Sequence, residues 1–126
     1  MKRIVIDAAA LLTWFDGDGP HRSLRAEYEA GALTVLAPRH LVADVLGELA
    51  ARDEPAPDRL ARIAGELQRL GVQLQDPPVA ELAGWLAQGL DPRRAAYAAL
   101  AASLDVPLAA ADADLRRVAT DLLLRG

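Results

Sequence analysis

Short apolar runs along the chain alternate with longer segments in which apolar residues recur at the spacing of a helix. Most of the runs are rich in Leu or in β-branched residues, which favour buried strands. Strands that alternate with helices predict an α/β fold with a parallel sheet covered by helices on both faces. The predicted strands are residues 4–6, 33–36, 72–74 and 106–110, with a further short strand at 122–124.

Residues that usually start or stop a helix bound the intervening segments. Pro20, Pro38 and Pro92 stand where a first helical turn accepts proline, and Gly31 and Gly71 stand where a helix ends. The predicted helices are residues 8–15, 21–30, 38–52, 58–70, 79–88, 92–103 and 115–119. No internal repeat or long linker separates these elements, so residues 1–126 are predicted to form a single domain.

The composition is that of a folded domain, with 52% hydrophobic and 25% charged residues. The sequence contains no cysteine, which excludes a disulfide and a thiolate metal site and fits a reducing compartment. No apolar stretch approaches the ~20 residues that a membrane helix needs. We therefore expect a cytoplasmic protein that does not associate with a membrane.

The net charge of −4 argues against a general binder of polyanions, which would carry a basic surface. It allows a nucleic-acid enzyme in which a local arginine patch surrounds an acidic, metal-filled centre. Lys2 is the only lysine, and it precedes the first predicted strand. A phosphoacceptor receiver domain also gathers acids at strand ends, but it needs a lysine near its site, so this class is set aside.

Two acidic residues follow predicted strands directly. Asp7 follows the strand at 4–6, and Asp112 follows the strand at 106–110, so both lie at the carboxyl edge where open α/β sheets bind ligands. If the two strands are neighbours, about 5 Å apart, both carboxylates come within reach of one metal ion. Asp44 interrupts an otherwise apolar helical segment, where an unpaired charge is costly.

Each carboxylate also has an ordinary structural explanation. Asp7 is a good helix N-cap, and Asp112 suits a cap or a turn. Asp44 could lie on the exposed edge of an amphipathic helix. Glu48, one turn beyond Asp44, and Asp114, two residues beyond Asp112, are interpreted as surface charges in the first instance.

Oxygen ligands without cysteine or a paired histidine favour a hard cation, Mg²⁺ or Mn²⁺, over Zn²⁺. His21 and His40 have no second histidine at ligand spacing, and they are interpreted as non-catalytic. A hard cation lowers the pKa of a bound water and stabilises negative charge, which is the chemistry of phosphodiester hydrolysis.

Four segments resemble, in order, those of the PIN domain, and most of all the short bacterial VapC-type toxin ribonucleases. They are residues 4–8, 37–46, 95–101 and 106–115. The resemblance implies a three-layer α/β/α fold with a mainly parallel, roughly five-stranded sheet. It also implies an acidic cluster that binds Mg²⁺ or Mn²⁺, cleavage of single-stranded RNA, a homodimer, and inhibition by a small antitoxin protein.

The resemblance assigns the catalytic, metal-binding acids by position. Asp7 matches the first acid, Asp44 the second, which is usually Glu, and Asp112 the acid at the last strand end. Asp114 could assist as a further ligand. These assignments are what the resemblance implies for this chain.

The third acid of the family is missing, because Arg94 stands three residues before Tyr97 where the family has Asp. A guanidinium could pair with Asp7 and Asp112 and take the place of the cation. Asp91, one turn earlier, could instead substitute as a ligand, or Arg94 could point to solvent. Two functions follow: a metal-dependent ribonuclease, or a catalytically degenerate PIN-like domain that binds protein or RNA.

Overall fold

The computed structural model describes residues 2–16, 22–52 and 56–124, so the predictions for Pro20 and His21 lie outside the described residues. Strands and helices alternate along most of the chain, as the sequence predicts. The strands are β1 (Lys2–Ile6), β2 (Leu33–Pro38), β3 (Gln73–Gln75) and β4 (Leu108–Ala109). The helices are α1 (Ala8–Asp16), α2 (Arg22–Glu29), α3 (Leu41–Arg52), α4 (Pro57–Leu70), α5 (Val79–Ala87), α6 (Pro92–Leu104) and α7 (Ala113–Val118), followed by the 3-10 helix η1 (Thr120–Leu122).

The sheet places β1 between β2 and β4, in the order β3-β2-β1-β4, and each of these pairs is parallel. Val5 lies opposite Leu108, and Ile6 lies opposite Ala109. The carboxyl ends of β1 and β4 are therefore level with each other. This meets the condition under which the acids that follow these two strands come close together.

The sheet has four strands among the described residues, where the sequence predicts about five. Leu123 forms only an isolated parallel bridge with Leu108, and the Leu124 N–H donates to the Leu108 carbonyl at 2.9 Å. The preceding residues, Thr120–Leu122, turn as a 3-10 helix. The chain therefore reaches the outer edge of β4 at a single bridging residue and forms no fifth strand there.

The prediction that Pro38 opens a helix is wrong, because Pro38 is the last residue of β2 and pairs with Gln75. The pairing of β2 with β1 ends at Leu36, so the missing N–H of Pro38 costs no bond on that side. Proline suits both a strand end and a first helical turn, and the pattern alone could not separate them. Helix α3 begins three residues later, at Leu41.

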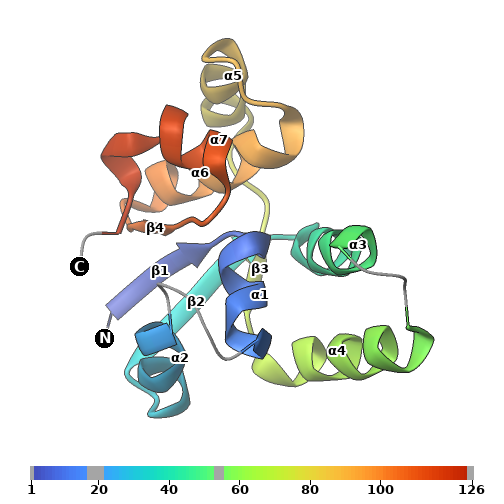
Figure 1. Ribbon diagram of the computed structural model, residues 1–126. Coiled ribbons are helices and arrows are strands. Elements are labelled where there is room, and N and C mark those ends of the chain that lie inside the picture. The colour runs from blue at the N-terminus through green and yellow to red at the C-terminus, as the bar shows by residue number, and fades with distance from the viewer. Residues whose placement is uncertain (1, 17–21, 53–55, 125–126) are drawn as a thin grey trace.

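Helices cover the sheet in two layers (Figure 1). Helix α6 packs against β1 and β2 with α5 on its outer side, and α7 lies in the same layer. Helix α1 packs on α3 in the opposite layer, and α3 in turn contacts α4. Helix α3 therefore lies across the carboxyl edge of the sheet from α6, and these two helices supply most of the polar side chains discussed below.

Small residues let α6 lie close to the sheet. Its residues from Ala95 to Ala101 are all buried, and five of these seven are Ala. The buried strand residues Ile4, Val5 and Ile6 pack into the same core, which fits a chain with only 4% aromatic residues.

No helix among the described residues is both long enough and apolar enough to cross a membrane.

Candidate active site

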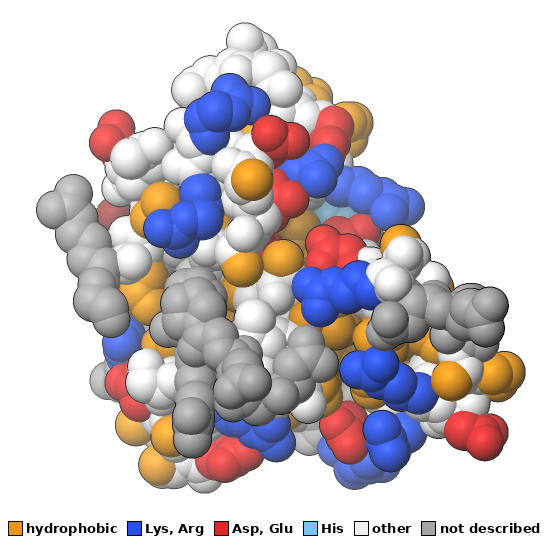
Figure 2. All heavy atoms as spheres, viewed as in Figure 1, with side chains coloured by type: hydrophobic (Ala, Val, Ile, Leu, Met, Phe, Trp, Pro, Cys, Tyr) orange, Lys and Arg blue, Asp and Glu red, His pale blue; other side chains and the backbone are white. Residues whose placement is uncertain are grey.

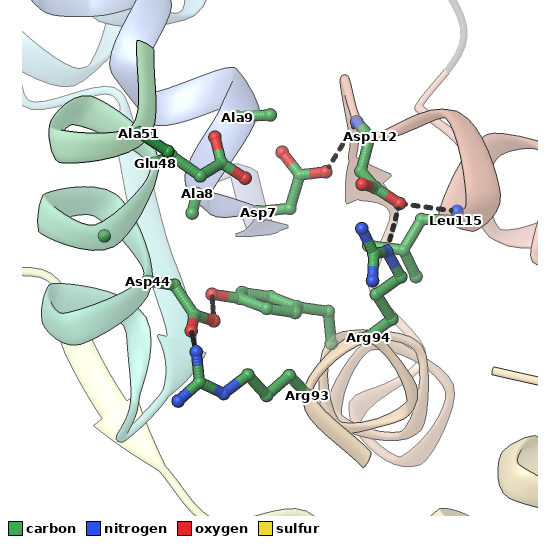
Figure 3. A pocket seen from close by; sticks show the side chains of 12 residues that line it. Asp7, Ala8, Ala9, Asp44, Glu48, Ala51, Arg93, Arg94, Asp112 and Leu115 are labelled. Atoms are coloured by element: carbon green, nitrogen blue, oxygen red, sulfur yellow. Dashed lines mark hydrogen bonds and ion pairs between the residues drawn. The ribbon is translucent and has the colours of Figure 1, made fainter. Parts of the chain in front are cut away.

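A pocket of about 370 Å³ lies at the carboxyl edge of the sheet, between α3 and α6 (Figure 3). It brings together acids from three parts of the chain, together with two arginines and a tyrosine from α6. The polar lining residues are Asp7, Asp44, Glu48, Arg93, Arg94, Tyr97 and Asp112. The structure therefore places the three acids predicted from the sequence around one pocket. Their catalytic role stays a prediction.

Asp7 is buried, with 2% of its surface exposed. Its Oδ1 accepts the N–H of Ala10 at 2.7 Å, as an N-cap residue does, and its Oδ2 accepts the N–H groups of Ala111 at 3.1 Å and Asp112 at 3.0 Å. Burial raises the pKa of Asp7, and these three backbone bonds oppose the rise. A carboxylate has about four lone-pair sites, so three donors leave room for one more partner.

Asp112 is paired with Arg94 of α6. It is the N-cap of α7, and its Oδ2 accepts the Leu115 N–H at 3.0 Å and the Arg94 Nε–H at 2.9 Å. Burial alone would raise the pKa of Asp112, but the bonds from Arg94 and from the Leu115 backbone hold that pKa below its usual value.

Arg94 also holds the carboxylate at the start of its own helix. Asp91 is the N-cap of α6, accepts the Arg94 backbone N–H at 2.9 Å, and forms an ion pair with the Arg94 guanidinium. These bonds lower the pKa of Asp91, the backbone bond being the largest cause. A weaker ion pair joins Arg94 Nε to Asp114 at 3.7 Å.

The predicted contact between Arg94 and Asp112 is therefore present, whereas among the described residues Arg94 forms no ion pair with Asp7. The alternative that Arg94 points to solvent is wrong, because it bridges two helix caps. Asp91 and Asp114 are exposed and do not line the pocket. Figure 3 shows the Arg94 side chain directed at Asp112 and away from Asp7.

Asp44 lies in a polar cluster on the other side of the pocket, with 10% of its side chain exposed. Its Oδ2 accepts the Tyr97 hydroxyl at 2.8 Å and lies 3.2 Å from His40 Nε2, and its Oδ1 lies 3.2 Å from Arg93 Nη1. Burial raises the pKa of Tyr97, and the negative charge of Asp44 raises it further. The charge of Asp44 is thus paired with Arg93, but its buried Oδ1 accepts no hydrogen bond among the described residues.

Sequence reasoning missed the partners of Asp44. His40 contacts the ring of Tyr97 edge-on, with centroids 5.3 Å apart, in addition to its contact with Asp44. The spacing of four between His40 and Asp44 was the available signal, because residues four apart lie on one helix face. Arg93 gave no such signal, since its contact with Asp44 crosses between two helices.

Glu48 is half-buried and lines the pocket, so its interpretation as a surface charge is wrong. Figure 3 shows its carboxylate directed toward Asp7. Burial raises the pKa of Glu48, and the charges of Asp7, Asp112 and Asp44 raise it further, although Arg52 acts in the opposite direction. Negative charge therefore accumulates on the side of the pocket that Glu48 and Asp7 share.

The mouth of the pocket carries both signs of charge. Figure 2 shows acidic and basic side chains gathered together between the upper helices and α3, with no large basic patch there. Arg93 is the more exposed of the two pocket arginines, with 71% of its side chain accessible against 39% for Arg94. Arg93 is thus the more accessible of the two pocket arginines, and its guanidinium also pairs with Asp44.

The donor set fits a hard divalent cation in an open site. Among the described residues no three acidic or histidine side chains are grouped closely enough to hold one ion. Mg²⁺ does not need such a cage, because it is commonly held by one or two carboxylates, several waters and a substrate phosphate. Asp7 and Glu48 face the pocket without an arginine between them, which suits this kind of site.

Comparison with known proteins gives a family match and a structural match. The model of the PIN domain family matches residues 4–121. The fold is similar to that in the crystal structure of PAE2754 from Pyrobaculum aerophilum, with a TM-score of 0.72 and 20% identity over 98% of this chain and 90% of that chain. At this identity the likeness concerns the fold alone. No curated protein matches the sequence.

Proposed function

We propose that this chain, which belongs to the PIN domain family, is a metal-dependent ribonuclease of the toxin–antitoxin type that cleaves single-stranded RNA. The observation that carries the proposal is the gathering of four carboxylates, Asp7, Asp44, Glu48 and Asp112, around one pocket at the carboxyl edge of the sheet. A folded protein does not bring like charges together without a cation or another counter-charge to stabilise them.

Different residues of the pocket would bind the cation and the RNA. Asp7 would hold Mg²⁺ or Mn²⁺, together with the Asp112 oxygen that neither Arg94 nor the Leu115 N–H contacts. The bound cation supplies an activated water and charge stabilisation for hydrolysis of the phosphodiester. The exposed guanidinium of Arg93 would bind a phosphate of the RNA at the mouth, where guanidinium geometry suits two phosphate oxygens.

A second function is a catalytically degenerate PIN domain that binds RNA or protein without cleaving RNA. The observation that favours it is the 2.9 Å bond from Arg94 Nε to Asp112 Oδ2, which matches the charge of one predicted ligand with a fixed cation. With this function, Arg94 neutralises the charge of Asp112. The other carboxylates of the pocket then no longer require a metal ion.

Cleavage of a labelled single-stranded RNA with Mn²⁺ or Mg²⁺ separates the two functions. The unaltered protein should cut the RNA, and a chelator should abolish the cutting. Asp7→Asn should reduce the rate by at least ~100-fold, because it weakens the cation site directly. The matched control is Asp58→Asn, at an exposed acid on α4 outside the pocket, which should keep the rate of the unaltered protein.

Thermal unfolding of the Asp7→Asn protein tests whether it is folded before its activity is compared. Cleavage that persists in chelator, or that survives Asp7→Asn, contradicts the proposed metal-dependent mechanism. An unaltered protein that binds RNA without cutting it at millimolar Mn²⁺ supports the degenerate function instead. A homodimer and a small antitoxin partner belong to the same proposal, because the VapC-type resemblance implies them.

A further inference from the structure

We propose that Glu48, and not Asp44, is the α3 carboxylate that completes the cation site with Asp7. This inference rests on the proposed function, since it concerns the same pocket and the same Mg²⁺ or Mn²⁺. It changes which residue of α3 binds the metal ion, and it gives Asp44 a different task. The sequence pattern alone favoured Asp44.

Asp44 is already engaged by neighbouring side chains. The Tyr97 hydroxyl and His40 contact its Oδ2 at 2.8 and 3.2 Å, and Arg93 contacts its Oδ1 at 3.2 Å. The buried Oδ1 accepts no hydrogen bond among the described residues, so a metal ion at Asp44 would approach that oxygen and would have to displace the Arg93 guanidinium, which lies 3.2 Å away. Direct coordination by Asp44 is therefore costly in this arrangement.

Glu48 lies one helical turn further along the same face of α3, and it reaches the pocket from there. Its carboxylate is directed toward Asp7, and the labelled side chains around it, Ala8, Ala9 and Ala51, are small (Figure 3). A Cβ added at Gly47 would meet no atom within 4 Å, so the space beside Glu48 is open. Gly47 also lines the pocket, so the α3 wall next to Glu48 leaves room for a ligand.

Glu48 also restores an acid that the chain has lost. Arg94 stands where the family has its third acid, and it takes up Asp112 as a partner. With Glu48 counted, four carboxylates still line the pocket in spite of this change. Glu48 starts one helical turn beyond Asp44 and carries one more methylene, and it lines the same pocket.

Asp44 then acts as a positioning residue. Through its carboxylate it connects Tyr97 and Arg93 of α6 to α3, and it holds the Arg93 guanidinium at the pocket mouth. Loss of Asp44 should therefore disturb Arg93, which meets the RNA, more than it disturbs the binding of the metal ion.

A titration with Mn²⁺ alone, followed by thermal unfolding without RNA, tests this assignment. In the unaltered protein Mn²⁺ should raise the melting temperature, because a ligand that binds only the folded state stabilises it. Glu48→Gln should weaken the apparent Mn²⁺ affinity by about tenfold or more. Asp44→Asn should lower the melting temperature in the absence of metal and change the Mn²⁺ affinity by less than about threefold.

The control is Glu81→Gln, at an exposed glutamate of α5 outside the pocket, which should bind Mn²⁺ as the unaltered protein does. If Asp44→Asn loses the Mn²⁺ response and Glu48→Gln keeps it, Asp44 is the ligand and the assignment of Glu48 fails while the nuclease proposal stands. If the unaltered protein shows no response to millimolar Mn²⁺, the metal-dependent function and the assignment fail together.

Discussion

At the scale of single residues, Asp7 both caps a helix and lines the pocket with one carboxylate. It caps α1 through the Ala10 N–H and fixes the loop after β4 through the N–H groups of Ala111 and Asp112. Capping and site formation were competing explanations from the sequence, and the geometry shows that one residue can serve both. Any change at Asp7 therefore affects the fold as well as the pocket.

The hydrogen bond between Tyr97 and Asp44 can be removed by deleting a single hydroxyl group. Tyr97→Phe keeps the buried ring but leaves Asp44 Oδ2 without its hydroxyl donor. We expect the free energy of unfolding to fall by about 1.5–3 kcal/mol, the range for hydrogen bonds to charged groups. Denaturant unfolding followed by tryptophan fluorescence measures the change.

A double-mutant cycle with Asp44→Asn isolates this contact. The two single changes should add up to clearly more than the double change, because both remove the same bond. Strict additivity would mean that the hydroxyl and the carboxylate do not interact in solution.

At the scale of elements, Arg94 links the starts of two helices. Its side chain bonds to Asp91, the N-cap of α6, and to Asp112, the N-cap of α7. Arg94 thus ties α7 to α6 beside the pocket.

This link predicts a pH-dependent effect of Arg94→Gln. The pKa values of Asp91 and Asp112 are lowered from 3.8 in the folded state, so the folded protein binds fewer protons there than the unfolded chain. The stability that Arg94 adds is therefore fully present above about pH 4 and is lost as the pH falls through the lowered pKa values.

Because both partners are partly exposed, we expect Arg94→Gln to cost about 1 kcal/mol at pH 7 and clearly less at pH 2.5. Denaturant unfolding of the two proteins at both pH values measures the difference. A cost that is the same at both pH values would exclude these carboxylates as the partners that matter.

The arrangement of the elements also shows which features of the pocket the sequence predicts and which it does not. The closeness of Asp7 and Asp112 follows from parallel strands that end at one sheet edge, and strand order was the only missing fact. The places of Glu48 and Arg93 in the pocket depend on how α3 packs against its neighbours, which no spacing within one helix reveals. Pro38 was misplaced because local preference allows it in two kinds of element.

At the scale of the whole molecule, the sheet order joins the beginning and the end of the described chain. Strand β1 is an interior strand of the sheet. Its neighbour β4 lies more than a hundred residues later in the chain. The match of the PIN family over residues 4–121 covers the same span. The four strands and the two helical layers were predictable because apolar periodicity fixes them, whereas the terminal segment forms only one bridge.

The contact between Asp7 and the Asp112 N–H spans 105 positions of the chain, and this has a consequence for how the protein is made. Contacts so distant in sequence form late, because the intervening chain must be ordered first. During synthesis, Asp7 therefore emerges long before the Ala111 and Asp112 N–H groups that it accepts, and only its cap contact with Ala10 can form early. Pulse-labelled hydrogen exchange during refolding should show the Asp112 amide protected among the last, whereas early protection would mean that β4 docks first. The pocket of this chain can therefore assemble only after residues as far as Asp112 have been made.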